Sequence, residues 1–246
     1  MGLLGANGAG KSTTMNMIAG YFAPTSGRIL WNGTDVRKLG PAYQNEVGYL
    51  PEVPPLHPEL TVRESMEYVC GLRGIRPGKR KAHIEQLCEL AGVADRMSMT
   101  TRSLSKGYKQ RAGLAQALIG NPELIILDEP TAGLDPAGAA SILANIETYR
   151  QANHATVILV SHSMEDVARL ADRLVVVSQG TLPYVGTPRE VFSHGEALES
   201  MGLAVPAMNR GFSRVRAMGV DIDPAVYTVE QAKAAILDAL RKKGGR

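Results

Sequence analysis

The most informative segment of this chain is a glycine-rich loop near its start, with the sequence Gly5-Ala6-Asn7-Gly8-Ala9-Gly10-Lys11-Ser12. The apolar residues 1–4 are typical of the end of a buried strand, and residues 12–19 have a helical pattern. Glycine lets successive backbone N–H groups converge on one anion without a Cβ clash, and the following helix directs its positive end toward that anion. The spacing therefore predicts a loop that binds the phosphates of a nucleotide.

Two side chains at the end of this loop suit a nucleotide triphosphate. Lys11 would neutralise oxygens of the β- and γ-phosphates, and the Ser12 hydroxyl would ligate Mg2+. We therefore expect ATP, with magnesium, to be held by Gly5, Ala6, Asn7, Gly8, Ala9, Gly10, Lys11, Ser12 and Thr13. A flexible glycine turn is the alternative, and the strand and helix on either side of the loop argue against it.

A second candidate element is the segment Leu124-Ile125-Ile126-Leu127-Asp128-Glu129. It places two carboxylates at the carboxyl end of a buried strand, which is where open α/β sheets bind their ligands. Asp128 would hold magnesium, directly or through water, and Glu129 would polarise the attacking water. Together with the phosphate loop, this acidic pair predicts ATP hydrolysis.

Short apolar segments alternate with helical patterns further along the chain, at residues 124–127, 156–160 and 174–177. Such segments are typical of a parallel sheet covered by helices on both faces, so the sequence predicts an α/β fold. A helix is expected over residues 136–149, with Asp135 as its N-cap. Gln179-Gly180 between two apolar segments indicates a hairpin.

Charge balance, apolar runs and cysteine positions argue against several types of partner and site. The 27 basic and 24 acidic residues nearly cancel, and nucleic-acid binders usually concentrate positive charge on one face, so we expect no nucleic-acid partner. The basic residues between Arg73 and Lys81 are expected to be a solvated turn between two helices. No apolar run approaches the ~20 residues of a membrane span. Cys70 and Cys88 lie in helical patterns, where buried thiols are favoured over a disulfide.

A third motif lies between the other two and reads Leu104-Ser105-Lys106-Gly107-Tyr108-Lys109-Gln110. Here the chain resembles the ATP-binding-cassette (ABC) family, whose signature reads LSGGQ or a close variant. The segment Ala132-Gly133-Leu134-Asp135 is similar to the D-loop of that family, and His162 is similar to its switch histidine. The resemblance covers nearly the whole chain, and the order and spacing of the five motifs make it specific.

The resemblance implies a P-loop NTPase fold with a mainly parallel sheet. It also implies a helical subdomain that carries the signature, and a small helical extension at the C-terminus. The ABC ATPase domain would span residues 1–195, with the helical subdomain at about 58–120, and the extension would span residues 196–246.

The resemblance further implies that two cassettes pair head to tail. ATP would lie between the phosphate loop of one and the signature of the other, where Ser105, the Gly107 N–H and Asp135 would complete the site. Glu129 would act as the general base, and His162 would stabilise charge on the γ-phosphate. The implied partners are transmembrane permease subunits and a second ABC ATPase, identical or different. The chain would then act as a peripheral subunit on the cytoplasmic side of the cell membrane.

Several positions depart from the family pattern. Ala6 stands where a proline is usual, and Glu52 stands where the family has its Q-loop glutamine. A carboxylate can still ligate magnesium, so Glu52 is a third candidate ligand and a candidate nucleotide-site residue. Lys106 and Tyr108 replace the residues that many signatures have at those positions.

Family members also carry strands and an adenine-stacking aromatic before the phosphate loop, whereas the loop begins at residue 5 here. We expect the strand at 27–32 to lack sheet partners and to expose an edge with Ile29 and Trp31. A chain with this start is expected to bind ATP poorly and to aggregate when alone.

The two halves of the chain resemble different subfamilies. The first half, through Pro136, resembles cassettes of multidrug and polysaccharide exporters, as in the segment from Gly48 to Glu52. The second half resembles the ATPases of energy-coupling-factor (ECF) importers of vitamins and metal ions, as in Gly186–His194 and a capping box at Thr228. An ECF-type importer subunit is slightly favoured. The alternatives are an exporter-type ATPase, an inactive truncated or hybrid cassette, and a soluble cassette that acts on DNA or ribosomes.

Overall fold

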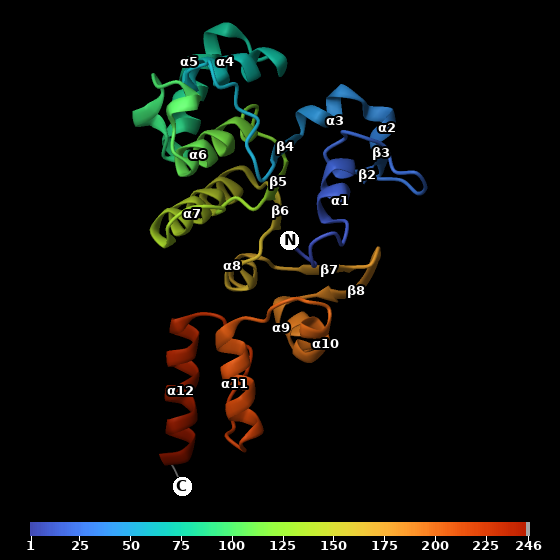
Figure 1. Ribbon diagram of the computed structural model, residues 1–246, viewed down its shortest axis with the longest axis vertical. Helices are drawn as coiled ribbons and strands as arrows, with labels where there is room; N and C mark the ends of the chain where they lie inside the picture. Colours follow the sequence, from blue (N-terminus) through green and yellow to red (C-terminus); the bar gives the residue numbers. More distant parts are fainter. Residues whose placement is uncertain (245–246) are drawn as a thin grey trace. The chain divides into compact units, whose positions relative to one another are not determined.

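A computed structural model describes residues 1–244 and divides into two compact units (Figure 1). The first unit combines Met1–Lys11 with the chain from Leu159 onward, and the second is Ser12–Ile158. Both units mix helices with strands, and the strand pairs are mostly parallel. The predicted α/β class with a mainly parallel sheet is confirmed.

In the first unit, a short buried strand lies between two parallel neighbours. Strand β1 (Gly2–Leu4) pairs with the end of β6 (Thr156–Val160) and with β7 (Leu174–Ser178). Strand β8 (Thr181–Gly186) pairs antiparallel with β7. The predicted hairpin is therefore present, and its turn residues Gln179 and Gly180 have positive φ angles of 48° and 73°. Two left-handed residues in a two-residue turn match the right-handed twist of the strands.

The remaining elements of this unit are helices: α8 (Met164–Leu170), α9 (Pro188–Phe192), α10 (Gly195–Ser200), α11 (Ala207–Ala217) and α12 (Val229–Gly244). The predicted capping box precedes α12. The Gln231 N–H donates to Thr228 Oγ1, and the Thr228 N–H donates to Gln231 Oε1, both at 3.2 Å. Because these reciprocal bonds satisfy two backbone donors, the helix begins where the sequence predicts.

In the second unit, the strand that ends in the acidic motif has a parallel neighbour. Strand β4 (Val47–Leu50) pairs with the fully buried β5 (Leu124–Asp128). The predicted strand at 27–32 is shorter: β2 (Leu30–Trp31) forms a small hairpin with β3 (Thr34–Asp35). The prediction that Trp31 lies on an exposed strand edge is wrong. This side chain is half-buried, and its ring meets that of Tyr43 edge-on, with centroids 5.7 Å apart.

Helices fill the rest of the second unit: α1 (Lys11–Ile18), α2 (Val36–Leu39), α3 (Pro41–Asn45), α4 (Val62–Leu72), α5 (Pro77–Ala91), α6 (Lys106–Ala117) and α7 (Pro136–Asn153), with short 3-10 turns at Ala94–Arg96 and Thr101–Ser103. The helices α4, α5 and α6 pack together (Figure 1) around buried apolar side chains such as Met66, Ile84 and Leu114. Helix α7 begins after Asp135, as predicted, and continues beyond the predicted end. Apolar burial of this kind, rather than propensity, supplies most helix stability.

Both cysteines are buried free thiols, as predicted. Burial raises the pKa of Cys70, and it raises the pKa of Cys88 to about 11. Both thiols are therefore protonated at neutral pH and poorly nucleophilic.

Two basic side chains are more deeply integrated than the sequence suggests. Arg73 was expected in a solvated turn, but its guanidinium donates to the carbonyls of Asn45 at 3.0 Å and Val47 at 2.8 Å. Burial lowers the pKa of Arg73. His83 lies in α5 and accepts a hydrogen bond from the Gly120 N–H at 3.0 Å. Both residues anchor the helical region to neighbouring backbone, because carbonyl and N–H groups near helix and strand ends need partners.

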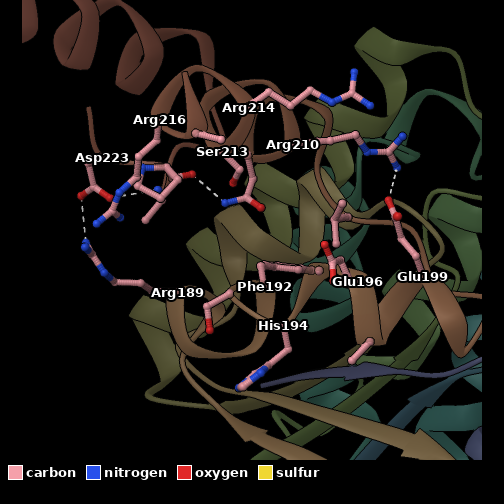
Figure 2. Close-up of a pocket in the computed structure, with 18 residues that line it drawn as sticks. Arg189, Phe192, His194, Glu196, Glu199, Arg210, Ser213, Arg214, Arg216 and Asp223 are labelled. Carbon is pink, nitrogen blue, oxygen red and sulfur yellow. Dashed lines mark hydrogen bonds and ion pairs between the residues drawn. The ribbon is translucent and has the colours of Figure 1, made fainter. Parts of the chain in front are cut away.

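The extension after residue 195 contributes to a cavity of about 860 Å³ (Figure 2). Ion pairs close two sides of it, between Arg189 and Asp223 at 2.9 Å and between Arg210 and Glu199 at 2.8 Å. The buried Asn209 donates through Nδ2 to the Pro224 carbonyl at 2.6 Å. Because exposed ion pairs contribute little, the buried amide bond is the stronger of these ties.

We therefore predict that Asn209→Ala lowers the free energy of unfolding by about 1–3 kcal/mol, because the Pro224 carbonyl loses a buried donor. Urea unfolding measures the loss, and amide hydrogen exchange over residues 207–226 locates it. Arg210→Ala is the matched control, with an expected loss below about 1 kcal/mol. Equal stability of the Asn209 variant and the unmodified chain would contradict the assignment.

Candidate nucleotide-binding site

The glycine-rich loop leaves β1 in a conformation that several of its glycines make possible. The Ala9 N–H donates to the Ala6 carbonyl at 3.1 Å, which closes a turn. Gly8 and Gly10 have φ angles of 78° and 101°, a left-handed region that side chains disfavour. At Gly5 the constraint is close approach, since a Cβ there would lie 2.6 Å from the Val177 carbonyl oxygen.

The lysine at the end of this loop folds back over it. Lys11 Nζ donates to the carbonyls of Gly5 at 2.7 Å and Ala6 at 3.1 Å. Lys11 is also the first residue of α1, so its backbone lies at the positive end of that helix. The loop therefore places a cation at the positive end of a helix, which is an arrangement suited to anionic phosphates.

In the second unit, the structure brings Ser12 to Asp128. The Ser12 hydroxyl donates to Asp128 Oδ2 at 3.3 Å, although the two residues are 116 positions apart. Asp128 ends β5 and is 9% exposed. Burial and the nearby Asp128 carboxylate raise the pKa of Tyr49 to about 12. The pair presents two hard oxygen atoms, the ligand type that Mg2+ prefers.

Glu129 has a strained backbone. Its φ angle is 51°, which is uncommon for a residue with a side chain. Its carbonyl accepts two hydrogen bonds at 3.0 Å, from the Ala132 N–H and from Nε2 of Gln110. Sequence reasoning quoted Gln110 within the signature but gave it no role, because a bond between residues 19 positions apart depends on packing.

The signature begins at the N-terminus of α6. Ser105 is the N-cap and accepts a hydrogen bond from the Tyr108 N–H at 3.4 Å. Gly107 faces the D-loop, since a Cβ there would lie 2.8 Å from Leu134 Cδ2. The signature thus meets the D-loop within one unit, and a side chain at Gly107 would require the Leu134 side chain to shift.

The unusual residues of this signature have local contacts. The hydroxyl of Tyr108 donates to Asp95 at 3.2 Å. The guanidinium of Arg96 lies over the Tyr108 ring, 5.0 Å from the ring centroid. The aliphatic part of Lys106 lies against Gly133 of the D-loop. These substitutions therefore add contacts around the start of α6, while Ser105 keeps its capping geometry.

The other predicted site residues lie as follows. Asp135 accepts a hydrogen bond from the Gly138 N–H at 2.6 Å and caps α7, as predicted. His162 is exposed and follows β6 in the first unit, and Glu52 is exposed in the loop after β4 in the second. Asn7 and Thr13 are exposed on either side of the glycine-to-helix transition. Among the predicted residues, the structure brings Lys11 onto the Gly5 and Ala6 carbonyls and Ser12 onto Asp128.

A cavity of about 360 Å³ opens beside β4 in the second unit. Its lining includes Tyr21, Tyr49, Leu72 and Arg73. Leu72 is 70% exposed, and Val53, in the loop after β4, is 79% exposed. Exposed apolar side chains beside a cavity are typical of surfaces that bind other molecules.

Residues 1–244 contain neither a metal-ligand cluster nor a membrane-spanning helix. Within this part of the chain, no three His, Cys, Asp or Glu side chains gather as a metal cluster. The described helices are too short or too polar to cross a bilayer.

Comparison with known proteins identifies the family. The family described as ABC transporter matches residues 1–132. The energy-coupling factor transporter ATP-binding protein EcfA2 of Caldanaerobacter subterraneus subsp. tengcongensis is 36% identical over 246 residues, covering 98% of this chain and 86% of that protein. This chain belongs to the ABC transporter family. It is an ATP-binding ATPase of that family, so the predicted family and activity are both confirmed.

Two further proteins resemble this ABC ATPase. The linearmycin resistance ATP-binding protein LnrL of Bacillus subtilis is 34% identical, covering 93% of this chain and 74% of LnrL. The solved structure of cbiO1 from Clostridium perfringens, described as part of the ABC transporter complex cbiONQ, superposes with a TM-score of 0.71 at 26% identity. The match covers 88% of this chain and 85% of cbiO1. The similarity therefore extends well beyond residue 132.

For this ABC ATPase we predict that Lys11→Ala weakens ATP binding by roughly 10- to 100-fold, because a charged hydrogen-bond donor to phosphate is lost. Isothermal titration calorimetry with magnesium present measures the affinity. The exposed Lys38, changed to Ala, serves as the control and should bind ATP like the unmodified protein. Unchanged affinity in the Lys11 variant would exclude this loop as the phosphate site.

Proposed function

We propose that this chain is the ATP-hydrolysing subunit of an ECF-type importer, acting with a second ABC ATPase and with membrane permease subunits. The observation that carries the proposal is the 36% identity to EcfA2 over 98% of this chain, which includes the C-terminal extension. The hydrogen bond between Ser12 and Asp128 supports it, because it joins the two motifs that such an ATPase requires. The subunit would lie on the cytoplasmic side of the membrane.

The phosphate loop binds the triphosphate in this proposal. Backbone N–H groups from Gly8 to Ser12 contact the β- and γ-phosphates, and Lys11 exchanges its loop carbonyls for phosphate oxygens. The glycines at 8 and 10 allow this because their backbone angles are already left-handed. Gly5, Ala6, Asn7, Ala9 and Thr13 complete the loop.

Ser12 and Asp128 fit magnesium, and Glu52 is a third candidate ligand. Mg2+ is usually held by one or two protein oxygens together with substrate phosphates, so this small donor set is sufficient. When bound, the ion would neutralise charge on the β- and γ-phosphates. Asp128 is well placed for this role because it is nearly buried and ends a rigid strand.

Glu129 follows Asp128 directly and polarises the attacking water in this proposal. A carboxylate next to the metal-binding position can orient a water and accept its proton. His162 follows β6 and would donate a hydrogen bond to the γ-phosphate, where negative charge develops. These two residues are the proposed catalytic groups.

A second cassette completes the site. Ser105 and the Gly107 N–H lie at the start of α6, whose positive end suits the γ-phosphate of a partner's ATP. Asp135 lies beside this helix through the contact of Leu134 with Gly107. The second ATPase can be identical to this chain or different.

The cavity beside β4 is the proposed contact with a permease. It lies next to the loop that carries Glu52, so a bound permease segment would reach the nucleotide site through that loop. The exposed Leu72 and Val53 supply apolar area for such a segment.

We predict that Glu129→Gln lowers kcat for ATP hydrolysis by roughly 100-fold or more while ATP still binds, because the amide cannot accept a proton. Phosphate release from the assembly purified from membranes measures turnover, and chelation of magnesium should abolish it. Glu123→Gln, an exposed acid before the same strand, is the control. Full turnover by the Glu129 variant would refute its role as the base.

We also predict that Leu72→Asp releases the chain from its permease partner, because a charge would enter an apolar interface. Co-purification from membranes measures the association. Leu182→Asp, at a similarly exposed site on β8, should leave it intact. If the Leu72 variant co-purifies with the permease as well as the control does, the permease contact lies on another surface.

A further inference from the structure

We infer that Gln110 is a positioning residue for Glu129, through which the signature helix governs the catalytic carboxylate. The inference rests on the proposed role of Glu129 as the general base. It goes beyond that role because it names a signature residue, with no role assigned so far, that determines whether the base is aligned.

The contact itself is specific. Gln110 lies on α6, is 1% exposed, and donates through Nε2 to the main-chain carbonyl of Glu129 at 3.0 Å. A buried amide without a partner is costly, so this bond has few alternatives inside the packed helical region. Its acceptor belongs to the residue that carries the reactive carboxylate.

The backbone of Glu129 needs such support. A left-handed φ of 51° costs a residue with a side chain about 1–3 kcal/mol and persists where the surroundings enforce it. The Ala132 N–H and Gln110 both bind the same carbonyl. The first bond belongs to the local turn, whereas the second comes from another helix. Loss of the second removes the contact that ties this peptide to α6, and we expect the carboxylate to shift in direction as a result.

One face of α6 contacts all of the neighbouring motifs. Gly107, Gln110 and Gly113 are spaced three residues apart and therefore share a face of the helix. A Cβ at Gly107 would meet Leu134 of the D-loop, and a Cβ at Gly113 would lie 2.6 Å from Pro54 Cβ, in the loop that carries Glu52. Gln110 lies between these two close contacts and reaches Glu129.

This arrangement gives the face a mechanical role. Because Gly107 and Gly113 have no side chains, α6 packs closely against Leu134 of the D-loop and against Pro54 of the loop after β4. A displacement of either loop therefore moves α6, and the Gln110 bond transfers the movement to the peptide of Glu129. The base would be aligned when the signature is engaged and misaligned when it is not.

The test is Gln110→Met, which keeps the length and packing of the side chain but removes the donor. In the purified membrane assembly, we expect kcat for ATP hydrolysis to fall by roughly 10- to 100-fold, since small misplacement of a catalytic group has effects of that size. The ATP dissociation constant should stay within about threefold, because Gln110 contacts no phosphate-loop residue in this scheme.

Thr101→Val is the matched control. Thr101 is equally buried, and its hydroxyl donates to the His57 carbonyl at 2.6 Å in the same unit, away from Glu129. This change should lower thermal stability but leave kcat unchanged. If Gln110→Met does not fold, Gln110→Glu replaces it, because an ionised carboxylate of the same shape cannot donate.

A double-mutant cycle separates positioning from general damage. In a Glu129→Gln background, the change at Gln110 should alter residual single-turnover hydrolysis less than about twofold, because the group it positions is already disabled. Three results would each overturn the inference. They are unchanged kcat in both Gln110 variants, an equal fall in kcat in Thr101→Val, and full additivity in the double-mutant cycle. Loss of turnover in Glu129→Gln together with normal turnover in Gln110→Met would overturn the inference alone and leave the proposed function intact.

Discussion

The contact between Ser12 and Asp128 is the constraint on which the second unit depends. It joins the first turn of α1 to the carboxyl end of β5, across 116 positions of sequence. Burying an aspartate at the end of the apolar strand β5 is costly, and the hydrogen bond from Ser12 offsets part of that cost. The fold therefore accepts the energetic cost of one nearly buried carboxylate at the position proposed to hold magnesium.

Backbone geometry supports the same chemistry at several separate points. Gly5 allows the loop to approach the Val177 carbonyl, and Glu129 keeps a left-handed backbone at the end of β5. Such local departures from ordinary geometry are stable because well-packed strands and helices surround them. The alignment proposed for Glu129 thus depends on main-chain contacts as well as on charged side chains.

The helical region shows where reasoning from the sequence was incomplete. The family resemblance implied a helical subdomain at about 58–120, and α4, α5 and α6 lie within these residues. The basic turn was expected to be solvated, yet Arg73 bonds two carbonyls near the start of β4. Trp31 was expected on a bare edge, yet it packs on Tyr43. Both errors concern long side chains whose partners lie far away in the sequence, where local pattern carries no signal.

The amino-acid sequence alone determined the motifs, their order, the α/β class and the family, because spacing and hydrophobic period are local properties that the chain displays directly. It also identified the caps at Asp135 and Thr228, since capping is decided within four residues. The tertiary structure alone decided that Gln110 reaches Glu129, that one face of α6 meets two loops, and that Ser12 bonds Asp128. Such pairings depend on packing between distant segments, and no spacing rule in a single sequence specifies them.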